Sequence, residues 1–189
     1  MKKIVLFASG TGTNAENIIV HFNKKNIGTV AAVFCNNPNA KVLDKAKKWN
    51  VPTVVFSKEE FSTDKVLQKL NSFQPDLIVL AGFLLKFPQN IIQTYPNKII
   101  NIHPALLPKY GGKGMYGMHV HRAIIENKET ETGISIHFVN EHYDEGNVIF
   151  QKTVTLAGNE TPEEIAEKVH QLEHQHFPEV IEKLITHNS

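Results

Sequence analysis

The chain has one cysteine, no long apolar run and almost no net charge, and each lack excludes a class of protein. The single Cys35 cannot form a disulfide within the chain, which argues against a disulfide-stapled secreted domain and suits a reducing compartment. The longest apolar stretch, residues 77–85, is interrupted by Gly82 and is far shorter than the roughly 20 residues that span a bilayer. We therefore expect a cytoplasmic protein with no membrane role.

The remaining composition is that of an ordinary globular domain. The formal net charge is +1 and the lysines are spread along the chain, so no nucleic acid is implied as a partner. The apolar run at residues 4–8 is shorter than the roughly 7–15 residues of a signal peptide, so we interpret it as a buried first strand. A length of 189 residues suits one domain covering residues 1–189.

Short runs rich in Val and Ile alternate with segments of helical periodicity. The predicted strands are residues 3–8, 29–34, 53–56, 77–80 and 98–102, and the predicted helices are 14–23, 40–49, 64–73 and 88–95. This alternation is typical of an α/β fold with a mostly parallel sheet and helices on both faces.

The second half of the chain departs from that alternation. Two late strands, residues 133–139 and 147–156, add an antiparallel strand. A final helix at about 162–185 starts from a capping box of Thr161 and Glu164, and Pro178 should kink or restart it.

The first predicted strand is joined to the first predicted helix by the glycine-rich loop Ser9-Gly10-Thr11-Gly12-Thr13-Asn14. Backbone N–H groups at a helix N-terminus bind anions, and the two threonines and the asparagine add side-chain donors. The loop therefore predicts a phosphate site, with a simple capped turn as the alternative.

The further residues that two common cofactor-binding motifs require do not accompany this loop. The second strand ends in Phe34-Cys35-Asn36-Asn37, without the acidic residue that holds the ribose of NAD. No Gly-Lys-Ser/Thr follows the loop, which excludes a Walker loop. A phosphate on a smaller substrate is the better interpretation.

Asn101 and His103 lie at the end of a predicted strand, where open parallel sheets place their ligand crevices. Residues two apart on a strand point to the same side, so the amide and the imidazole can converge on one substrate atom. Asp144, in the loop between the late strands, would complete the group. Such a trio can polarise a carbonyl, stabilise the oxyanion and move protons during attack by an amine, although each residue alone could simply make a turn.

His170, Glu173 and His174 match the H-x-x-E-H pattern of a class of metalloproteases. A third ligand is hard to find because the chain offers few residues beyond Pro178, so we expect no metal. His119 and His121 are interpreted as loop or helix-face residues rather than ligands.

Taken together, segments along nearly the whole chain resemble the phosphoribosylglycinamide formyltransferase family. They are residues 9–14, Leu80-Ala81-Gly82-Phe83, Asn101-Ile102-His103-Pro104-Ala105-Leu106-Leu107-Pro108, His137-Phe138-Val139, Asp144-Glu145-Gly146 and Gln171-Leu172-Glu173-His174. The resemblance implies a single-domain formyltransferase-like fold. Its nucleotide-phosphate half would be about residues 1–100 and its folate and catalytic elements about 80–150.

The resemblance implies transfer of the formyl group of 10-formyltetrahydrofolate, a co-substrate, to the amine of glycinamide ribonucleotide in de novo purine biosynthesis. It implies Asn101 as oxyanion donor, His103 as electrophile and proton donor, Asp144 as the residue that orients His103 and relays protons, and Glu173 as the receiver of the substrate's amine end. The implied phosphate-binding residues are Gly10, Thr11, Gly12, Thr13 and Asn14. The implied folate-binding residues are Phe83, Leu84, Leu85, Lys86, Phe87, Asn140, Glu141, His142 and Tyr143.

Three departures limit this resemblance. Leu84 and Leu85 stand where the family commonly has Met and Arg, with Lys86 as the nearest substitute. Lys65 is the nearest replacement for a basic residue beside the phosphate, and the loop at residues 111–118 is longer than the family's turn.

Other functions remain alternatives. Formyltetrahydrofolate hydrolase and methionyl-tRNA formyltransferase share the scaffold but normally carry a further domain, which we do not expect here. An idle nucleotide-binding module is an alternative of a different class. For the leading hypothesis we expect a monomer or homodimer that acts on small molecules.

Overall fold

The computed structural model describes residues 1–187 and divides them into two compact units. The first unit comprises Met1–Ile100 together with the chain from Pro178 onward, and the second comprises Asn101–Phe177. The boundary falls inside strand β5 (Ile99–His103). The glycine-rich loop therefore belongs to the first unit, and Asn101, His103, Asp144 and Glu173 belong to the second.

The strands of the first unit form a parallel sheet. They are β1 (Lys2–Ala8), β2 (Gly28–Cys35), β3 (Thr53–Val55), β4 (Leu77–Leu80) and the start of β5. β1 pairs in parallel with β2 and β4, and β2 pairs in parallel with β3, which gives the order β3-β2-β1-β4. Residues 4–8 and 77–80 are all buried, as expected for parallel strands covered on both faces.

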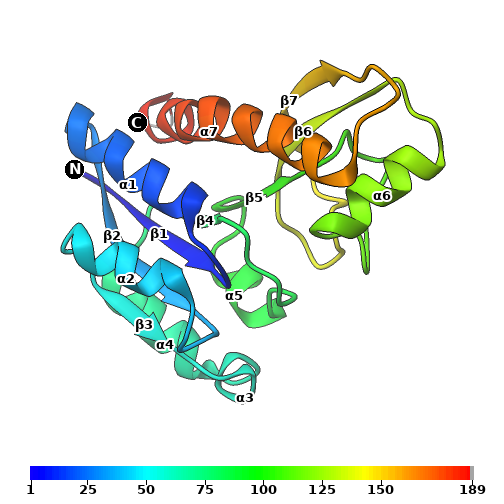
Figure 1. The fold of residues 1–189 in the computed structure, drawn as a ribbon. Helices are drawn as coiled ribbons and strands as arrows, with labels where there is room; N and C mark the ends of the chain where they lie inside the picture. The colour runs from blue at the N-terminus through cyan, green and yellow to red at the C-terminus, as the bar shows by residue number, and fades with distance from the viewer. Residues whose placement is uncertain (188–189) are drawn as a thin grey trace. The chain divides into compact units, whose positions relative to one another are not determined.

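The helices of the first unit fall into two groups. They are α1 (Thr13–Lys25), α2 (Lys41–Lys48), α3 (Lys58–Phe61), α4 (Asp64–Phe73) and α5 (Gln89–Thr94), all labelled in Figure 1. α1 contacts α2, and α4 contacts α3 and α5. Because crossovers are right-handed and the strand order reverses between β1 and β4, the two groups cover opposite faces of the sheet. The predicted fold class is confirmed.

An aromatic cluster fills the core beneath the carboxyl ends of these strands. Phe7 of β1 stacks on Phe34 of β2 with ring centroids 4.9 Å apart, and it meets the edge of Phe87 at 4.9 Å. The other rings of the cluster are Phe56, Phe61, Phe73 and Phe83. Because burial of one such ring contributes about 1.5–3 kcal/mol, the cluster holds the segment after β4 firmly against the sheet.

Cys35 ends β2 and is fully buried. Its Sγ–H lies 3.2 Å from the carbonyl oxygen of Asn37. Burial raises the pKa of this thiol, so the reactive thiolate is disfavoured.

The second unit contains the antiparallel pair. It comprises the end of β5, α6 (Met118–Glu126), β6 (Glu131–Phe138), β7 (Val148–Thr155) and the first part of α7 (Pro162–His187). β5 neighbours β6, and β6 pairs antiparallel with β7, with a register shift between Ile136 and His137. The predicted late antiparallel strand is confirmed.

The predicted secondary structure lacked the helices α3 and α6, and one of the two outcomes predicted for Pro178 was wrong. The helix α6 was not predicted, because its first residue follows Gly117 and no side chain caps it, so the sequence carries no start signal. The predicted capping box of α7 is present, with Thr161 N–H donating to Glu164 at 2.7 Å. Of the two outcomes predicted at Pro178, a kink or a restart, only the restart is wrong, because α7 continues through this residue. Buried neighbours such as Phe177 and Ile181 offset the loss of one N–H. No helix among residues 1–187 is both long and apolar enough to cross a bilayer.

Candidate active site

Four polar side chains of the second unit form a connected cluster. His103 Nδ1, at the end of β5, lies 3.5 Å from Asp144 Oδ2. Asp144 Oδ1 lies 3.5 Å from His137 Nε2, and the Asn101 amide nitrogen lies 3.2 Å from the same ring nitrogen. The structure therefore brings together the three residues that the sequence predicted and adds a second histidine.

Asp144 is held in place by the loop at residues 111–118, which follows β5. Its carboxylate accepts a hydrogen bond from the backbone N–H of Gly112 at 3.0 Å, and its side chain is 11% exposed. A Cβ at position 111 would lie 2.6 Å from Leu107 Cδ2 and 3.2 Å from the Asp144 Cβ, so a larger residue there would displace these neighbours. Asp144 itself has a φ of 54°, a left-handed conformation that is costly for a residue with a side chain. Both features fix where the carboxylate lies.

The charges in the cluster follow from burial and from these contacts. Burial is the largest influence on His103 and lowers the pKa of its imidazole below 6.5, although Asp144 and the carbonyl of Tyr110 act in the opposite direction. Burial would raise the pKa of Asp144, but the hydrogen bond with His137, the interaction with His103 and the N–H of Gly112 together bring that pKa below its ordinary value. At neutral pH the site therefore pairs an ionised carboxylate with a neutral His103.

His137 is the member of this cluster that the sequence analysis named only within a motif and not as a candidate site residue. Its ring is buried, and its Nδ1 lies 2.9 Å from the carbonyl oxygen of Phe138, which can only accept a hydrogen bond. Nδ1 therefore carries a proton, and Nε2 faces both the Asn101 amide nitrogen and the Asp144 carboxylate. The contact with Asn101 leaves the second hydrogen of its amide for a ligand. A polar residue inside a strand of buried side chains is the signal that could have identified it.

A buried serine shapes the turn that follows His103. Ser135 Oγ donates to the carbonyl of Ala105 at 2.7 Å and accepts from the N–H of Leu107 at 2.9 Å. Gln151 Nε2 also donates to this hydroxyl at 2.8 Å. Because unsatisfied buried groups cost about 1–3 kcal/mol each, this network fixes the path of the backbone out of β5.

Glu173 lies on α7 and pairs with His170, whose Nδ1 is 3.2 Å from its carboxylate. Its side chain is 13% exposed, and its charge raises the pKa of both His103 and His121, which places it in their electrostatic neighbourhood. His170 and His174 lie with ring centroids 4.1 Å apart. No group of three or more His, Cys, Asp and Glu suited to a metal occurs in the described part of the chain.

The glycine-rich loop of the first unit has an open side and a closed side. Gly12 precedes α1 and supplies no side-chain cap to the first helical turn, and the N-terminus of a helix attracts anions. Gly10 and Thr11 are exposed, whereas Gly12 is buried against α2. Ser9 has a structural role instead, because its hydroxyl donates to Asn36 at 2.6 Å and accepts from the N–H of Leu84 at 3.0 Å.

The closed side of this loop predicts a strong asymmetry between its two glycines. In Gly12→Ala the new Cβ would lie 2.4 Å from Val42 Cγ2 and 2.7 Å from Val42 Cα, at a φ of 71°. We expect a loss of about 2–4 kcal/mol in the free energy of unfolding, measured by urea denaturation. Gly10→Ala is the matched control, since nothing lies within 4 Å of its Cβ, and it should stay within about 0.5 kcal/mol of the wild type. Equal stability of the two variants would contradict the close packing of Gly12 against Val42.

The predicted folate-binding residues fall in two segments, one in each unit. In the first, Phe83 and Phe87 belong to the aromatic cluster, while the Leu84 side chain is 59% exposed. In the second, Asn140 Oδ1 accepts from the N–H of His142 at 2.9 Å, and the Tyr143 side chain is 41% exposed. Leu84 and Tyr143 are therefore the apolar side chains of these segments that are open to a ligand.

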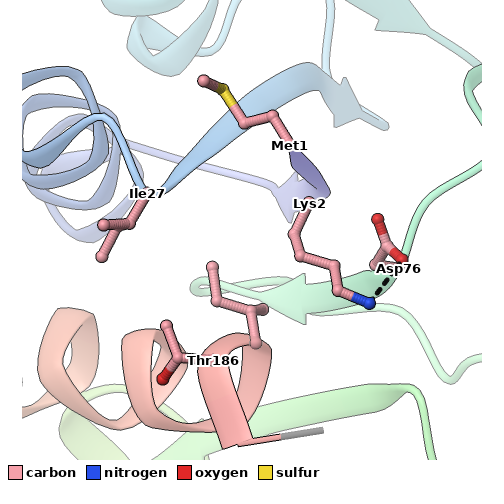
Figure 2. Close-up of a pocket in the computed structure, with 6 residues that line it drawn as sticks. Met1, Lys2, Ile27, Asp76 and Thr186 are labelled. Atoms are coloured by element: carbon pink, nitrogen blue, oxygen red, sulfur yellow. Dashed lines mark hydrogen bonds and ion pairs between the residues drawn. The ribbon is translucent and has the colours of Figure 1, made fainter. Parts of the chain in front are cut away.

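A hollow of the first unit lies at the amino ends of β1 and β4. Figure 2 shows Met1, Lys2, Ile27, Asp76 and Thr186 around it, with Lys2 Nζ 3.4 Å from Asp76. It adjoins the start of β1, whereas parallel sheets bind ligands at the carboxyl ends of their strands. We therefore place the candidate active site at the end of β5.

The fold and the cluster at the end of β5 leave the class of protein open, and a comparison with family models identifies it. The model described as Formyl transferase matches residues 2–181, so the class is that of the formyl transferases. The chain belongs to the phosphoribosylglycinamide formyltransferase family.

Relatives of that name match along the length of the chain. The chain is 33% identical to the enzyme of Bacillus subtilis over 195 residues, which cover 100% of this chain and 97% of the relative. It is 35% identical to the enzyme of Escherichia coli, with 94% and 84% covered. The chloroplastic enzyme of Arabidopsis thaliana is 36% identical over 95% of this chain, which spans 64% of that relative's length.

The structural comparison gives the same family. The crystal structure of phosphoribosylglycinamide formyltransferase from Bacillus halodurans matches with a TM-score of 0.89 and 31% identity, covering 100% of this chain and 97% of that one. The crystal structure of glycinamide ribonucleotide transformylase 1 from Geobacillus kaustophilus matches with a TM-score of 0.89 and 35% identity, covering 97% and 98%.

Proposed function

We propose that the protein transfers the formyl group of 10-formyltetrahydrofolate to the amine of glycinamide ribonucleotide, giving formylglycinamide ribonucleotide and tetrahydrofolate in purine biosynthesis. The observation that supports this most directly is the ionised Asp144 between two buried histidines, with the Asn101 amide beside one of them. This arrangement supplies an oxyanion donor and a proton relay, which are the two aids that amine attack on a formyl group requires.

The reaction can be written with every proton accounted for. The amine nitrogen bonds to the formyl carbon, and the carbonyl oxygen becomes an oxyanion that accepts the second amide hydrogen of Asn101. The proton lost by the attacking nitrogen passes to Nδ1 of His103, assisted by the negative charge of Asp144. Collapse of the intermediate breaks the bond to folate nitrogen N10, which takes that proton from the His103 ring. His103 therefore acts first as proton acceptor and then as proton donor.

The pKa of His103 makes the pH dependence of this step testable. Because burial lowers the folded-state pKa below 6.5, the unfolded chain takes up this proton first as the pH falls. The free energy of unfolding should therefore decrease as the pH falls from about 6.5 to the folded-state pKa. An NMR titration of the imidazole, with the signal assigned by its absence in His103→Gln, should give a midpoint below 6.5. A midpoint above that value would contradict the neutral resting ring.

We also propose where the two substrates bind. The nucleotide phosphate would lie on Gly10, Thr11, Gly12, Thr13 and Asn14, and Glu173 would receive the amine end of the substrate. The start of α1, which has no side-chain cap, supports the phosphate site. The charge of Glu173 raises the pKa of His103, and this supports the role of Glu173 beside the reacting amine. Folate would contact residues 83–87 and residues 140–143.

One assay tests the function against its alternatives. Purified protein is given 10-formyltetrahydrofolate with and without glycinamide ribonucleotide, and the release of tetrahydrofolate is followed. Turnover that needs both substrates is the expected result. Turnover with folate alone would indicate a hydrolase, and absence of turnover would favour an idle nucleotide-binding module.

The remaining proposals concern organisation. The whole chain would act as one formyltransferase domain, working in the cytoplasm as a monomer or homodimer. Light scattering at micromolar concentration distinguishes the two oligomeric states. The single buried thiol of Cys35 supports a reducing compartment.

A further inference from the structure

The second nitrogen of the His103 ring has its own partner in the loop after β5. His103 Nε2 lies 2.6 Å from the backbone carbonyl oxygen of Tyr110. A carbonyl oxygen can only accept a hydrogen bond, so Nε2 must carry the proton in both the neutral and the charged ring. The neutral ring then has its lone pair on Nδ1, which is the nitrogen that faces Asp144.

Tyr110 is fixed by contacts of its own. Its hydroxyl donates to Glu129 Oε1 at 2.8 Å, and Lys109 Nζ lies 3.2 Å from the same oxygen. The backbone of Tyr110 has a φ of 56°, a left-handed conformation that costs about 1–2 kcal/mol for a residue with a side chain. Burial and the neighbouring Glu129 raise the pKa of Tyr110 to about 12, so the hydroxyl keeps its donor hydrogen in any ordinary assay.

The same short segment holds both partners of the proton relay. The carbonyl of Tyr110 accepts from His103, and two residues later the N–H of Gly112 donates to Asp144. A displacement of this segment would therefore change the orientation of the ring and of the carboxylate together. The tether to Glu129 opposes such a displacement, because it anchors Tyr110 to the turn that precedes β6.

We infer that Tyr110, tethered by Glu129, is a positioning residue that fixes His103 as the Nε2–H tautomer and so makes Nδ1 the only ring atom that exchanges protons with the substrates. This inference rests on the proposed function for its kinetic consequence, but the tautomer itself is a property of the free protein. With the opposite tautomer, Nδ1 would already carry a proton and could not accept one from the attacking amine.

The tautomer can be read directly from nitrogen-15 NMR spectra of the imidazoles of the full chain, recorded at a pH where His103 is neutral. His103→Gln identifies the signals by their absence. The wild type should show a protonated Nε2 and a bare Nδ1. Tyr110→Phe should show a mixture of both tautomers and about a tenfold lower kcat, equivalent to about 1.4 kcal/mol, with little change in either KM.

Two further variants make the test specific. Tyr116→Phe is the matched control, because Tyr116 lies in the same loop with a side chain that is 53% exposed, and it should keep the wild-type tautomer and rate. Glu129→Gln weakens the tether without removing the Tyr110 ring, and it should shift the tautomer in the same direction as Tyr110→Phe.

The outcomes separate this inference from the proposed function. A protonated Nδ1 in the wild type, or an unchanged tautomer and kcat in both Tyr110→Phe and Glu129→Gln, would overturn the positioning role. A wild type with the expected tautomer but no formyl transfer would reject the proposed function while supporting the positioning of His103.

Discussion

Replacing His103 with alanine is expected to lower kcat by about two to four orders of magnitude, the range that general acid and base catalysis contributes. The variant loses the ring that we propose accepts the amine proton at Nδ1 and returns it to the folate nitrogen. Nucleotide binding should largely survive, because the proposed phosphate loop lies in the other compact unit of the chain. Single-turnover rates with both substrates, together with calorimetric binding of the nucleotide, measure the two effects separately.

The control for this variant is His119→Ala, which removes an exposed histidine of the same unit. It should retain nearly the wild-type rate. If His103→Ala kept a kcat within tenfold of the wild type, the ring at position 103 would have no part in proton transfer, and the proposed mechanism would need another base.

Replacing Asp144 with asparagine is expected to lower kcat by a similar factor, about two to four orders of magnitude. The amide has nearly the same shape and can still accept from the N–H of Gly112, but it lacks the charge that faces His103 and His137. Because that charge raises the pKa of His103, the imidazole should titrate at a still lower pH in the variant. The rate and the NMR titration should therefore change together.

Glu145→Gln is the matched control for the charge, since Glu145 is the next residue and is exposed. It removes one negative charge from the same loop and should alter neither the rate nor the titration of His103 appreciably. A wild-type rate in Asp144→Asn would show that the carboxylate only supports the loop.

The sequence predicted those parts of the molecule that depend on local patterns. The strand at residues 77–80 and the helix at residues 64–73 were predicted with the observed bounds, because an unbroken apolar run and a helical period are local signals. The family and the fold class are likewise confirmed, because motifs from separate segments were considered together.

Other parts depend on contacts that no local pattern contains. The helix α6 was missed because glycines precede it and no capping side chain marks its start. His137 was named only as part of a motif, since its contacts with Asn101 and Asp144 join segments far apart in the chain. The contact between His103 and Tyr110 uses a backbone carbonyl, a group that every residue carries, so the identity of residue 110 could not reveal it.

The buried thiol of Cys35, at the end of β2, has a practical benefit for these experiments. Since this thiol is packed in the interior and its pKa is raised, maleimide reagents should leave the native protein untouched. A cysteine introduced on the surface, for example beside Tyr143, would then be the single attachment point for a fluorescent dye. Such a dye could follow ligand binding without any prior removal of the natural cysteine.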